Sequence, residues 1–202
     1  MTFLIATNNA HKLAEIRRIL GPLGIHGVSL AEADVHVNPE ETGETFEENA
    51  RIKAVSGMLA SGLPTVADDS GLCVDALHGA PGVYSARYAG EGASDRDRIE
   101  KLLSELRDVP QGARTARFVC AVCCVFPGGG ELSCRGECRG AIAFEPQGTG
   151  GFGYDPVFIE STTGRSFSSL SGEEKDRLSH RGKALTDFAV LLNKKYAGKL
   201  GG

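Results

Sequence analysis

The sequence lacks an apolar stretch long enough to span a bilayer. Its longest uninterrupted apolar run, Phe118–Phe126, has nine residues, whereas a transmembrane helix needs ~20. The N-terminus has no basic segment ahead of a long apolar stretch, so a secretory signal is not evident. We therefore expect a soluble protein of the cytoplasm.

A strong excess of one charge is also missing. Lys and Arg number 22 and Asp and Glu 26, which gives a net charge of −4. A mildly acidic chain does not coat a nucleic acid polymer or an anionic membrane by bulk attraction, so an anionic ligand must be held by local charge. With 41% hydrophobic and 24% charged residues, the composition excludes disordered and coiled-coil classes. A chain of 202 residues predicts one domain or two small lobes.

The six cysteines are too sparse for a disulfide scaffold. Cys120, Cys123, Cys134 and Cys138 imitate a zinc pattern. On a strand, however, Cys120 and Cys123 point to opposite faces and cannot share one ion without a bend. We favour free structural thiols over a zinc site.

Strand and helix patterns alternate along the chain, which predicts an α/β fold. The capping-box pairs Thr45/Glu48, Ser94/Asp97 and Ser171/Glu174 predict helix starts, and Gly62 predicts a helix end. Strands are expected at 3–6, 64–67, 72–74, 115–126, 131–144 and 157–159, and the polar segment 68–71 is expected to interrupt the second and third of them. A second lobe is expected at about 79–145. The last helix is expected to end near Gly198.

Thr7–Lys12 lies where a strand gives way to a helix. Free backbone N–H groups and the positive end of the helix dipole can bind an anion there. Lys12 adds a full positive charge, although a lone lysine at a helix start is also typical of a solvated surface.

Two acidic pairs stand at expected element boundaries, Glu40-Glu41 and Asp68-Asp69. Mg²⁺ prefers carboxylate oxygens, usually one or two together with phosphate oxygens. The alternatives are favourable charge at a helix N-terminus for the glutamates and an Asx turn for the aspartates. Lys53 shares a helix face with Asn49 and either snorkels or faces the acids.

Gly148–Gly153 matches the pattern G-x-G-x-x-G, but Tyr154-Asp155-Pro156 follows it where a dinucleotide-binding motif would open a helix. We interpret the segment as a loop that presents Phe152, Tyr154 and Asp155 to a base. Lys175 and Ser179–Gly182 either supply hydrogen-bond donors to an anion or to the edge of a base, or are simply solvated. A G-x-S-x-G nucleophile elbow is absent, so the sequence offers little support for a serine hydrolase.

Together these stretches resemble the inosine triphosphate pyrophosphatase family, also called the Ham1 family, in order and over nearly the whole chain. The matching stretches are TNNAHK at 7–12, EETGETFEENARIKA at 40–54, ADDSGLCVDAL at 67–77, GAPGVYSARYAG at 79–90, GTGGFGYDPVF at 148–158 and SHRGKAL at 179–185.

The resemblance implies a two-lobed α/β fold with a long mixed sheet, flanking helices and a cleft between the lobes, in a homodimer. It also implies Mg²⁺-dependent hydrolysis of ITP, dITP and XTP to the monophosphate and pyrophosphate. Asp69 would be the general base, Ser70 would touch the substrate, and Glu40 and Asp69 would hold the metal, with Glu41 as an alternative to Glu40. The resemblance assigns the triphosphate to Thr7, Asn8, Asn9, Ala10, His11, Lys12 and Lys53, and the base to Phe152, Gly153, Tyr154, Asp155, Lys175, His180 and Arg181.

Two other readings stay open at this point. One is a nucleoside triphosphate pyrophosphatase with a different base specificity. The other is a nucleotide sensor without catalysis, in which Asp69 only forms a turn.

Overall fold

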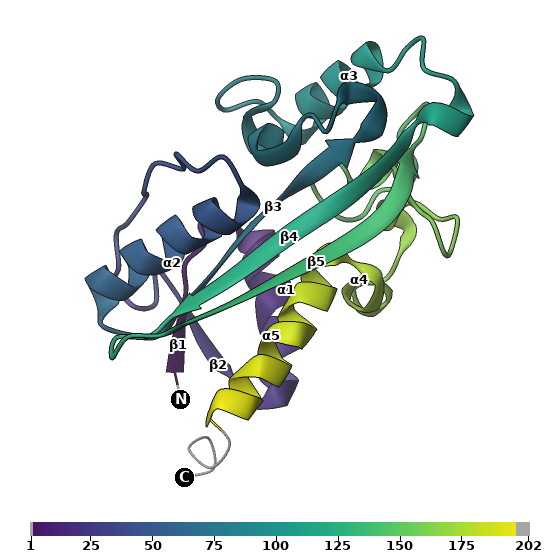
Figure 1. Cartoon of the computed structure of the whole chain (residues 1–202). Helices are drawn as coiled ribbons and strands as arrows, with labels where there is room; N and C mark the ends of the chain where they lie inside the picture. Colours follow the sequence, from purple (N-terminus) through teal and green to yellow (C-terminus); the bar gives the residue numbers. More distant parts are fainter. Residues whose placement is uncertain (1, 197–202) are drawn as a thin grey trace. The chain divides into compact units, whose positions relative to one another are not determined.

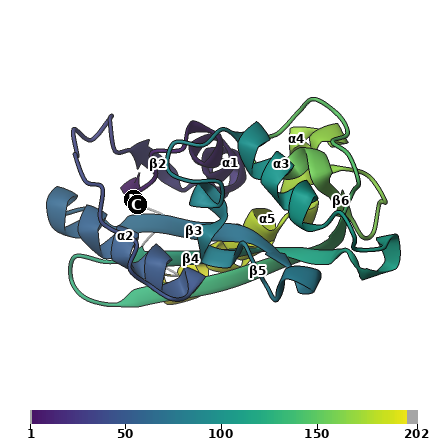
Figure 2. The same cartoon turned by 90° about the horizontal axis from the view of Figure 1, so that it is seen from above.

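The computed structural model describes residues 2–196. A mixed six-stranded sheet has the order β2-β1-β3-β4-β5-β6. Strand β1 pairs in parallel with β2 and β3, and β5 pairs antiparallel with β6. The strands are β1 (Thr2–Ile5), β2 (His26–Ser29), β3 (Thr65–Val74), β4 (Thr115–Val125), β5 (Glu131–Ile142) and β6 (Phe158–Glu160). The mixed sheet with flanking helices confirms the predicted α/β class, and β3, β4 and β5 lie side by side in it (Figure 1, Figure 2).

The helices begin where the capping signals indicate. Side chains of Thr45, Ser94 and Ser171 each accept a hydrogen bond within a complete capping box, and Gly62 ends its helix in the left-handed conformation. The helices are α1 (Ala10–Leu20), α2 (Phe46–Ser61), α3 (Asp95–Glu105), α4 (Gly172–Leu178) and α5 (His180–Tyr196). The expected end of the last helix near Gly198 lies outside the described residues.

The chain divides into two compact units. Unit 1 comprises residues up to Asp69, then Cys120–Gly136 and the residues from His180 onward, and unit 2 comprises Ser70–Val119 and Glu137–Ser179. The segment 79–145, expected as a second lobe, contributes to both units because 120–136 belongs to unit 1.

Within unit 1, helices cover both faces of the sheet. Phe3, Ile5 and Val66 share a core with apolar residues of α1 and α5, and α1 packs against α5. Leu4 and Thr65, which point the other way on their strands, approach Gly57 of α2. Because successive side chains alternate along a strand, α2 lies on the face opposite to α1 and α5.

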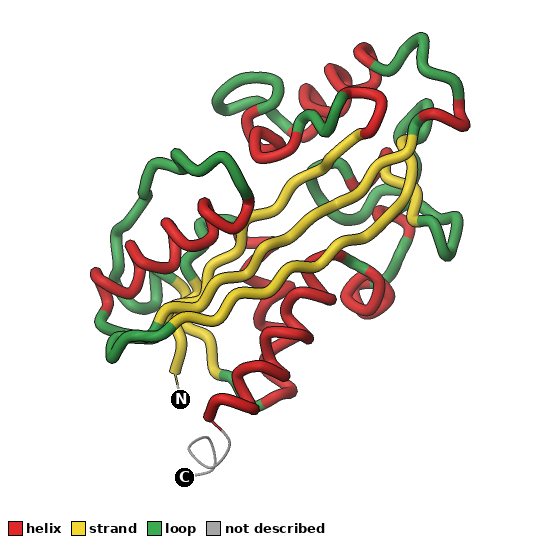
Figure 3. Tube along the Cα trace, in the orientation of Figure 1, coloured by secondary structure: helices red, strands yellow, loops and turns green. Residues whose placement is uncertain are grey.

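Strand β3 is continuous, which corrects the predicted break at residues 68–71. Figure 3 shows it as one uninterrupted strand, and all ten of its residues are in extended structure. Two polar residues and a glycine are typical of turns, but strand pairing and burial override that local preference here. The Asx-turn interpretation of the aspartate pair is therefore wrong.

Unit 2 has its own core. It combines Leu72 and Val74 of β3 with Leu102 of α3 and the stacked rings of Phe118 and Phe167, whose planes lie 1° apart. Among residues 2–196, none of the helices combines the length and the apolar character needed to cross a bilayer.

The cysteines are free thiols. Cys120 belongs to the core under α1 and α5, whereas Cys123 lies 3.5 Å from Glu131. As expected for a strand, their side chains alternate between the two faces.

Candidate active site

The loop between β1 and α1 forms a capped helix start. The Asn9 side chain accepts hydrogen bonds from the backbone N–H groups of His11 and Lys12 at 2.9 and 3.1 Å. Thr7 Oγ1 in turn accepts one from the Asn9 N–H at 3.2 Å. Residues 8–11 are exposed, so the positive end of α1 faces solvent with Lys12 in its first turn. The predicted strand-loop-helix junction is confirmed, and it is chemically suited to bind an anion.

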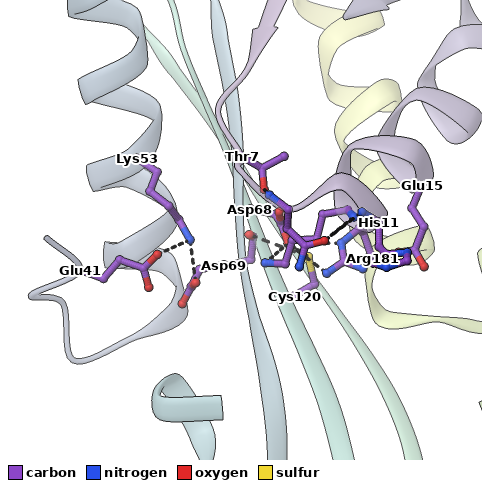
Figure 4. Close-up of polar contacts among 12 residues, drawn as sticks. Thr7, His11, Glu15, Glu41, Lys53, Asp68, Asp69, Cys120 and Arg181 are labelled. Carbon is purple, nitrogen blue, oxygen red and sulfur yellow. Dashed lines mark hydrogen bonds and ion pairs between the residues drawn. The ribbon is translucent and has the colours of Figure 1, made fainter. Parts of the chain in front are cut away.

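Asp68 and Asp69 point to opposite faces of β3 (Figure 4). Asp68 is on the side of Val66, which faces α1 and α5, and Asp69 is on the side of Thr65, which faces α2. Each aspartate meets a different lysine there, Lys12 for Asp68 and Lys53 for Asp69. One dipeptide thus supplies carboxylates to two separate clusters.

Asp68 is the centre of a buried ionic cluster. Its Oδ2 lies 3.0 Å from Lys12 Nζ and accepts hydrogen bonds from Arg181 Nε and Nη2, both at 3.2 Å. Arg181 also donates to Glu15, and the thiol of Cys120 lies 3.8 Å from the same Asp68 oxygen. Burial alone would raise the pKa of Asp68, but the charges of Lys12, Arg181 and Lys53 outweigh it and hold that pKa well below its usual range.

On the opposite face, Lys53 joins two carboxylates. Its Nζ lies 2.8 Å from Asp69 Oδ1 and 2.9 Å from Glu41 Oε1 (Figure 4). Burial raises the pKa of Asp69, although the positive charges of Lys53 and Lys12 act in the opposite direction. A carboxylate with a raised pKa is a better proton acceptor, which is the property that a general base requires.

The donor set around Lys53 fits a hard divalent cation that phosphate oxygens help to hold. Asp69 Oδ2 is buried and has no hydrogen-bond partner among the described residues. Glu41 is half-buried beside it, whereas Glu40 is exposed. Residues 2–196 hold no group of three or more His, Cys, Asp or Glu side chains arranged to bind a metal. Mg²⁺ usually takes one or two carboxylates and completes its shell with water and phosphate oxygens, so Glu41 and Asp69 suffice.

A second polar cluster lies in unit 2. Lys175 Nζ is 2.6 Å from Asp155 Oδ2, and both side chains are less than 10% exposed. The same Asp155 oxygen accepts the Phe152 N–H at 2.9 Å, and Lys175 Nζ lies 4.6 Å from the centre of the Phe152 ring. The predicted base-binding residues Phe152, Asp155 and Lys175 are therefore in mutual contact.

The neighbours of Phe152 in the loop are held differently. The Gly153 N–H donates to Asp95 Oδ2 at 2.6 Å. Tyr154 is buried in the core of unit 2 and donates its hydroxyl to the Ser85 carbonyl at 2.9 Å. The Tyr154 ring is therefore part of the core of unit 2, while Phe152 remains partly exposed.

The expected site residues fall into both units. Unit 1 holds Thr7–Lys12, both glutamates, Lys53, Asp69, His180 and Arg181, and unit 2 holds Ser70 and the base-binding candidates Phe152–Asp155 and Lys175.

Sequence reasoning missed Glu15 and gave Asp68 no role. A signal for Glu15 exists, because it falls between Lys12 and Ile16 on the apolar face of α1, where an acid needs a buried partner.

Two oppositely facing lysine–carboxylate clusters beside an exposed helix start define an α/β protein equipped to bind a polyanionic ligand. Residues 3–191 match the Ham1 family, and the chain belongs to that family. This confirms the resemblance that the six sequence stretches carry.

Relatives are similar over nearly their full length. A dITP/XTP pyrophosphatase of Nocardia farcinica is 51% identical over 192 residues, which cover 94% of this chain and 93% of that protein. A dITP/XTP pyrophosphatase of Bacillus subtilis is 47% identical, with 94% and 96% covered. Among solved structures, a HAM1 protein from Coxiella burnetii superposes with a TM-score of 0.87 at 41% identity, covering 96% of this chain and 99% of that one.

Proposed function

We propose that the protein is a dITP/XTP pyrophosphatase, a hydrolase that cleaves ITP, dITP and XTP to the monophosphate and pyrophosphate and so cleanses the nucleotide pool of the cytoplasm. The observation that carries the proposal is Asp69, a buried carboxylate with a raised pKa that is paired with Lys53 at 2.8 Å. The relatives named above support the choice of substrate. A homodimer is part of the proposal, on the strength of the family resemblance.

Asp69 acts as the general base. It accepts a proton from a water molecule while that water's oxygen forms a bond to the α-phosphorus. The bond between the α-phosphorus and the bridging oxygen breaks, and pyrophosphate leaves with the electron pair. Lys53 holds Asp69 in place through the contact at 2.8 Å. Positioning and electrostatic stabilisation supply most of the acceleration in such phosphoryl chemistry.

Cations of unit 1 bind the triphosphate. The exposed start of α1 and Lys12 offer positive charge, and Lys53 adds a second ammonium from α2. Glu41 and Asp69 would hold Mg²⁺, and Glu40, which is exposed, would not. When bound, Mg²⁺ neutralises phosphate charge and favours departure of the leaving group.

Base recognition rests on donors to the 6-keto oxygen of hypoxanthine or xanthine. In unit 2, Lys175 is the donor that we assign to the base, and the partly exposed Phe152 ring is the stacking surface. His180 and Arg181, which the family resemblance also assigns to the base, are buried in unit 1. A donor in this position leaves the amino group of adenine facing another donor, and an unpaired arrangement of this kind costs ~1–3 kcal/mol.

Product analysis after incubation with dITP and Mg²⁺ tests the reaction. Monophosphate plus pyrophosphate is the expected result, and diphosphate plus orthophosphate would contradict it. A substrate panel then tests base choice. We expect the rate on dITP or XTP to exceed that on dATP, dGTP and dTTP by at least ~10²-fold. A flat profile would mean a pyrophosphatase of other specificity, and binding without turnover would mean a sensor.

A further inference from the structure

Two carboxylates hold the backbone on either side of Phe152. The Phe152 N–H donates to Asp155 Oδ2 at 2.9 Å, and the next N–H along the chain, that of Gly153, donates to Asp95 Oδ2 at 2.6 Å. These N–H groups belong to the two peptide planes that flank the Cα of Phe152. Because a peptide plane is rigid, holding both planes fixes φ and ψ of Phe152. The direction in which its ring leaves the backbone is then fixed as well.

Asp95 reaches this loop from a distant part of the chain. It is the first residue of α3 and precedes Gly153 by 58 positions, whereas Asp155 lies within the loop itself. Both aspartates and the loop belong to unit 2. A hydrogen bond inside the loop shapes the loop, but a hydrogen bond from α3 also fixes its place relative to the rest of the unit.

Arg98 holds the Asp95 side chain in place. Arg98 Nη2 donates to Asp95 Oδ1, while Asp95 Oδ2 accepts from the Gly153 N–H. Arg98 Nη1 donates to the carbonyl of Ala86 at 2.6 Å, so the guanidinium is held at two points. Asp95 and Arg98 are three residues apart on α3 and share one face of that helix. The carboxylate is therefore oriented before the loop meets it.

A carboxylate in the first turn of a helix also has a simpler role, because it stabilises the positive end of the helix dipole. Asp97 supplies the comparison, since it lies in the same turn of α3. Its Oδ2 accepts hydrogen bonds from the N–H and the hydroxyl of Ser94. Stabilisation of the dipole is common to both aspartates, and of the two it is Asp95 that bonds to the loop.

We propose that Asp95 is a positioning residue for base recognition, which fixes the Phe152 ring as a stacking surface by accepting the Gly153 N–H. Asp95 acts through the loop and is not itself a ligand of the nucleotide. The inference rests on the proposed function and deepens it, because it adds to Phe152 and Lys175 a residue on which affinity for the base depends. The triphosphate is assigned to cations of unit 1, so its affinity does not depend on Asp95.

The test compares the full-length variants Asp95→Ala and Asp95→Asn with the control Asp97→Ala. Two dissociation constants are measured by calorimetry. One is that of dIMP, the monophosphate product of dITP, which carries the base, and the other is that of inorganic tripolyphosphate, which does not. Asp95→Ala is also combined with Phe152→Ala in a double-mutant cycle, which shows whether the two residues act together. Urea unfolding establishes that each variant is folded.

We expect Asp95→Ala to raise the dissociation constant of dIMP by ~10-fold, because a hydrogen bond to a charged group is lost. The dissociation constant of tripolyphosphate should stay unchanged. Asp95→Asn keeps an oxygen that accepts the Gly153 N–H, so dIMP should bind within ~3-fold of the wild type. Asp97→Ala should change neither constant. When Phe152 is already alanine, Asp95→Ala should weaken dIMP binding by less than ~2-fold further.

Several outcomes would overturn the inference. They are unchanged dIMP binding in Asp95→Ala, an equal loss of tripolyphosphate binding, and an equal loss of dIMP binding in Asp97→Ala, which would assign the effect to the stability of α3. Binding of dIMP by Asp95→Asn as weak as by Asp95→Ala, or an undiminished effect of Asp95→Ala in the Phe152→Ala background, would also contradict it. A wild type that does not bind dIMP would refute the proposed function itself, whereas wild-type binding that is insensitive to Asp95 refutes this inference alone.

Discussion

Asp68 and Asp69 are adjacent in the chain, yet their carboxylates lie on opposite faces of β3 and pair with different lysines, Lys12 at 3.0 Å and Lys53 at 2.8 Å. Strand geometry sends the two carboxylates to opposite faces, because consecutive side chains on a strand alternate, and the packing of α1 and α2 supplies the two lysines. Asp68 is fully buried in a charge-balanced cluster and Asp69 pairs with Lys53, and each of the two keeps one buried oxygen without a hydrogen-bond partner among the described residues. This arrangement and the packing around it lead to four predictions.

Asp69→Asn removes the proposed base but keeps the size of the side chain. We expect kcat on dITP to fall at least ~10²-fold because proton abstraction from water is lost, with nucleotide binding retained. Steady-state kinetics and equilibrium binding of dITP to the same preparation measure the two effects. Turnover close to that of the wild type would remove Asp69 from the role of base.

Glu40 and Glu41 form a natural matched pair for the metal assignment. Glu41→Gln should raise the Mg²⁺ concentration that gives half-maximal activity by ~10-fold or more, because a carboxylate ligand becomes a neutral amide. Glu40→Gln should leave it unchanged, since Glu40 is exposed. Magnesium titrations at saturating dITP distinguish the variants, and the opposite order would reassign the ligand to Glu40.

Gly57→Ala should destabilise the protein by ~1–3 kcal/mol, because an added methyl group overpacks the contact between α2 and the sheet. A Cβ at this position would lie 2.8 Å from Thr65 Cγ2 and 3.1 Å from Leu4 Cδ2. Gly21→Ala is the control, because a Cβ there meets nothing within 4 Å. Urea unfolding curves measure both. Equal stability of the two variants would contradict the close packing of α2.

The lowered pKa of Asp68 makes its contribution to stability depend on pH in a defined direction. The pKa of Asp68 is lower in the folded protein than the ~3.9 of an aspartate in the unfolded chain. Such a carboxyl contributes its full stabilisation at pH values above the unfolded pKa. The contribution is lost as the pH falls toward and through the folded pKa. The stability difference between the wild type and Asp68→Asn should therefore be largest near neutral pH and shrink below about pH 4. The urea midpoints of both proteins, measured between pH 7 and pH 3, test this. A stability difference that grows as the pH falls would contradict the lowered pKa of Asp68.

Sequence patterns predicted most of the local structure and the positions of the chemistry-bearing segments. The capping boxes at Thr45, Ser94 and Ser171 are local hydrogen-bond arrangements, so residues three apart suffice to predict them. The helix start beside Lys12 follows from the same kind of short-range signal. The resemblance of six stretches then indicated the family, because their order along the chain is readable without a structure.

Long-range packing decided the rest. The sequence Asp-Asp-Ser-Gly has the composition of a turn, and only pairing and burial inside the sheet keep it extended. The pairing of Asp68 with Lys12 and Arg181, and of Asp69 with Lys53 and Glu41, joins residues that are distant in the chain. No local pattern specifies such contacts, since they exist only when α1, α2 and α5 pack on their respective faces of β3. The sequence by itself determined which groups are available, and tertiary structure determined which carboxylate each cation meets, because burial makes an unpaired charge too costly to leave alone.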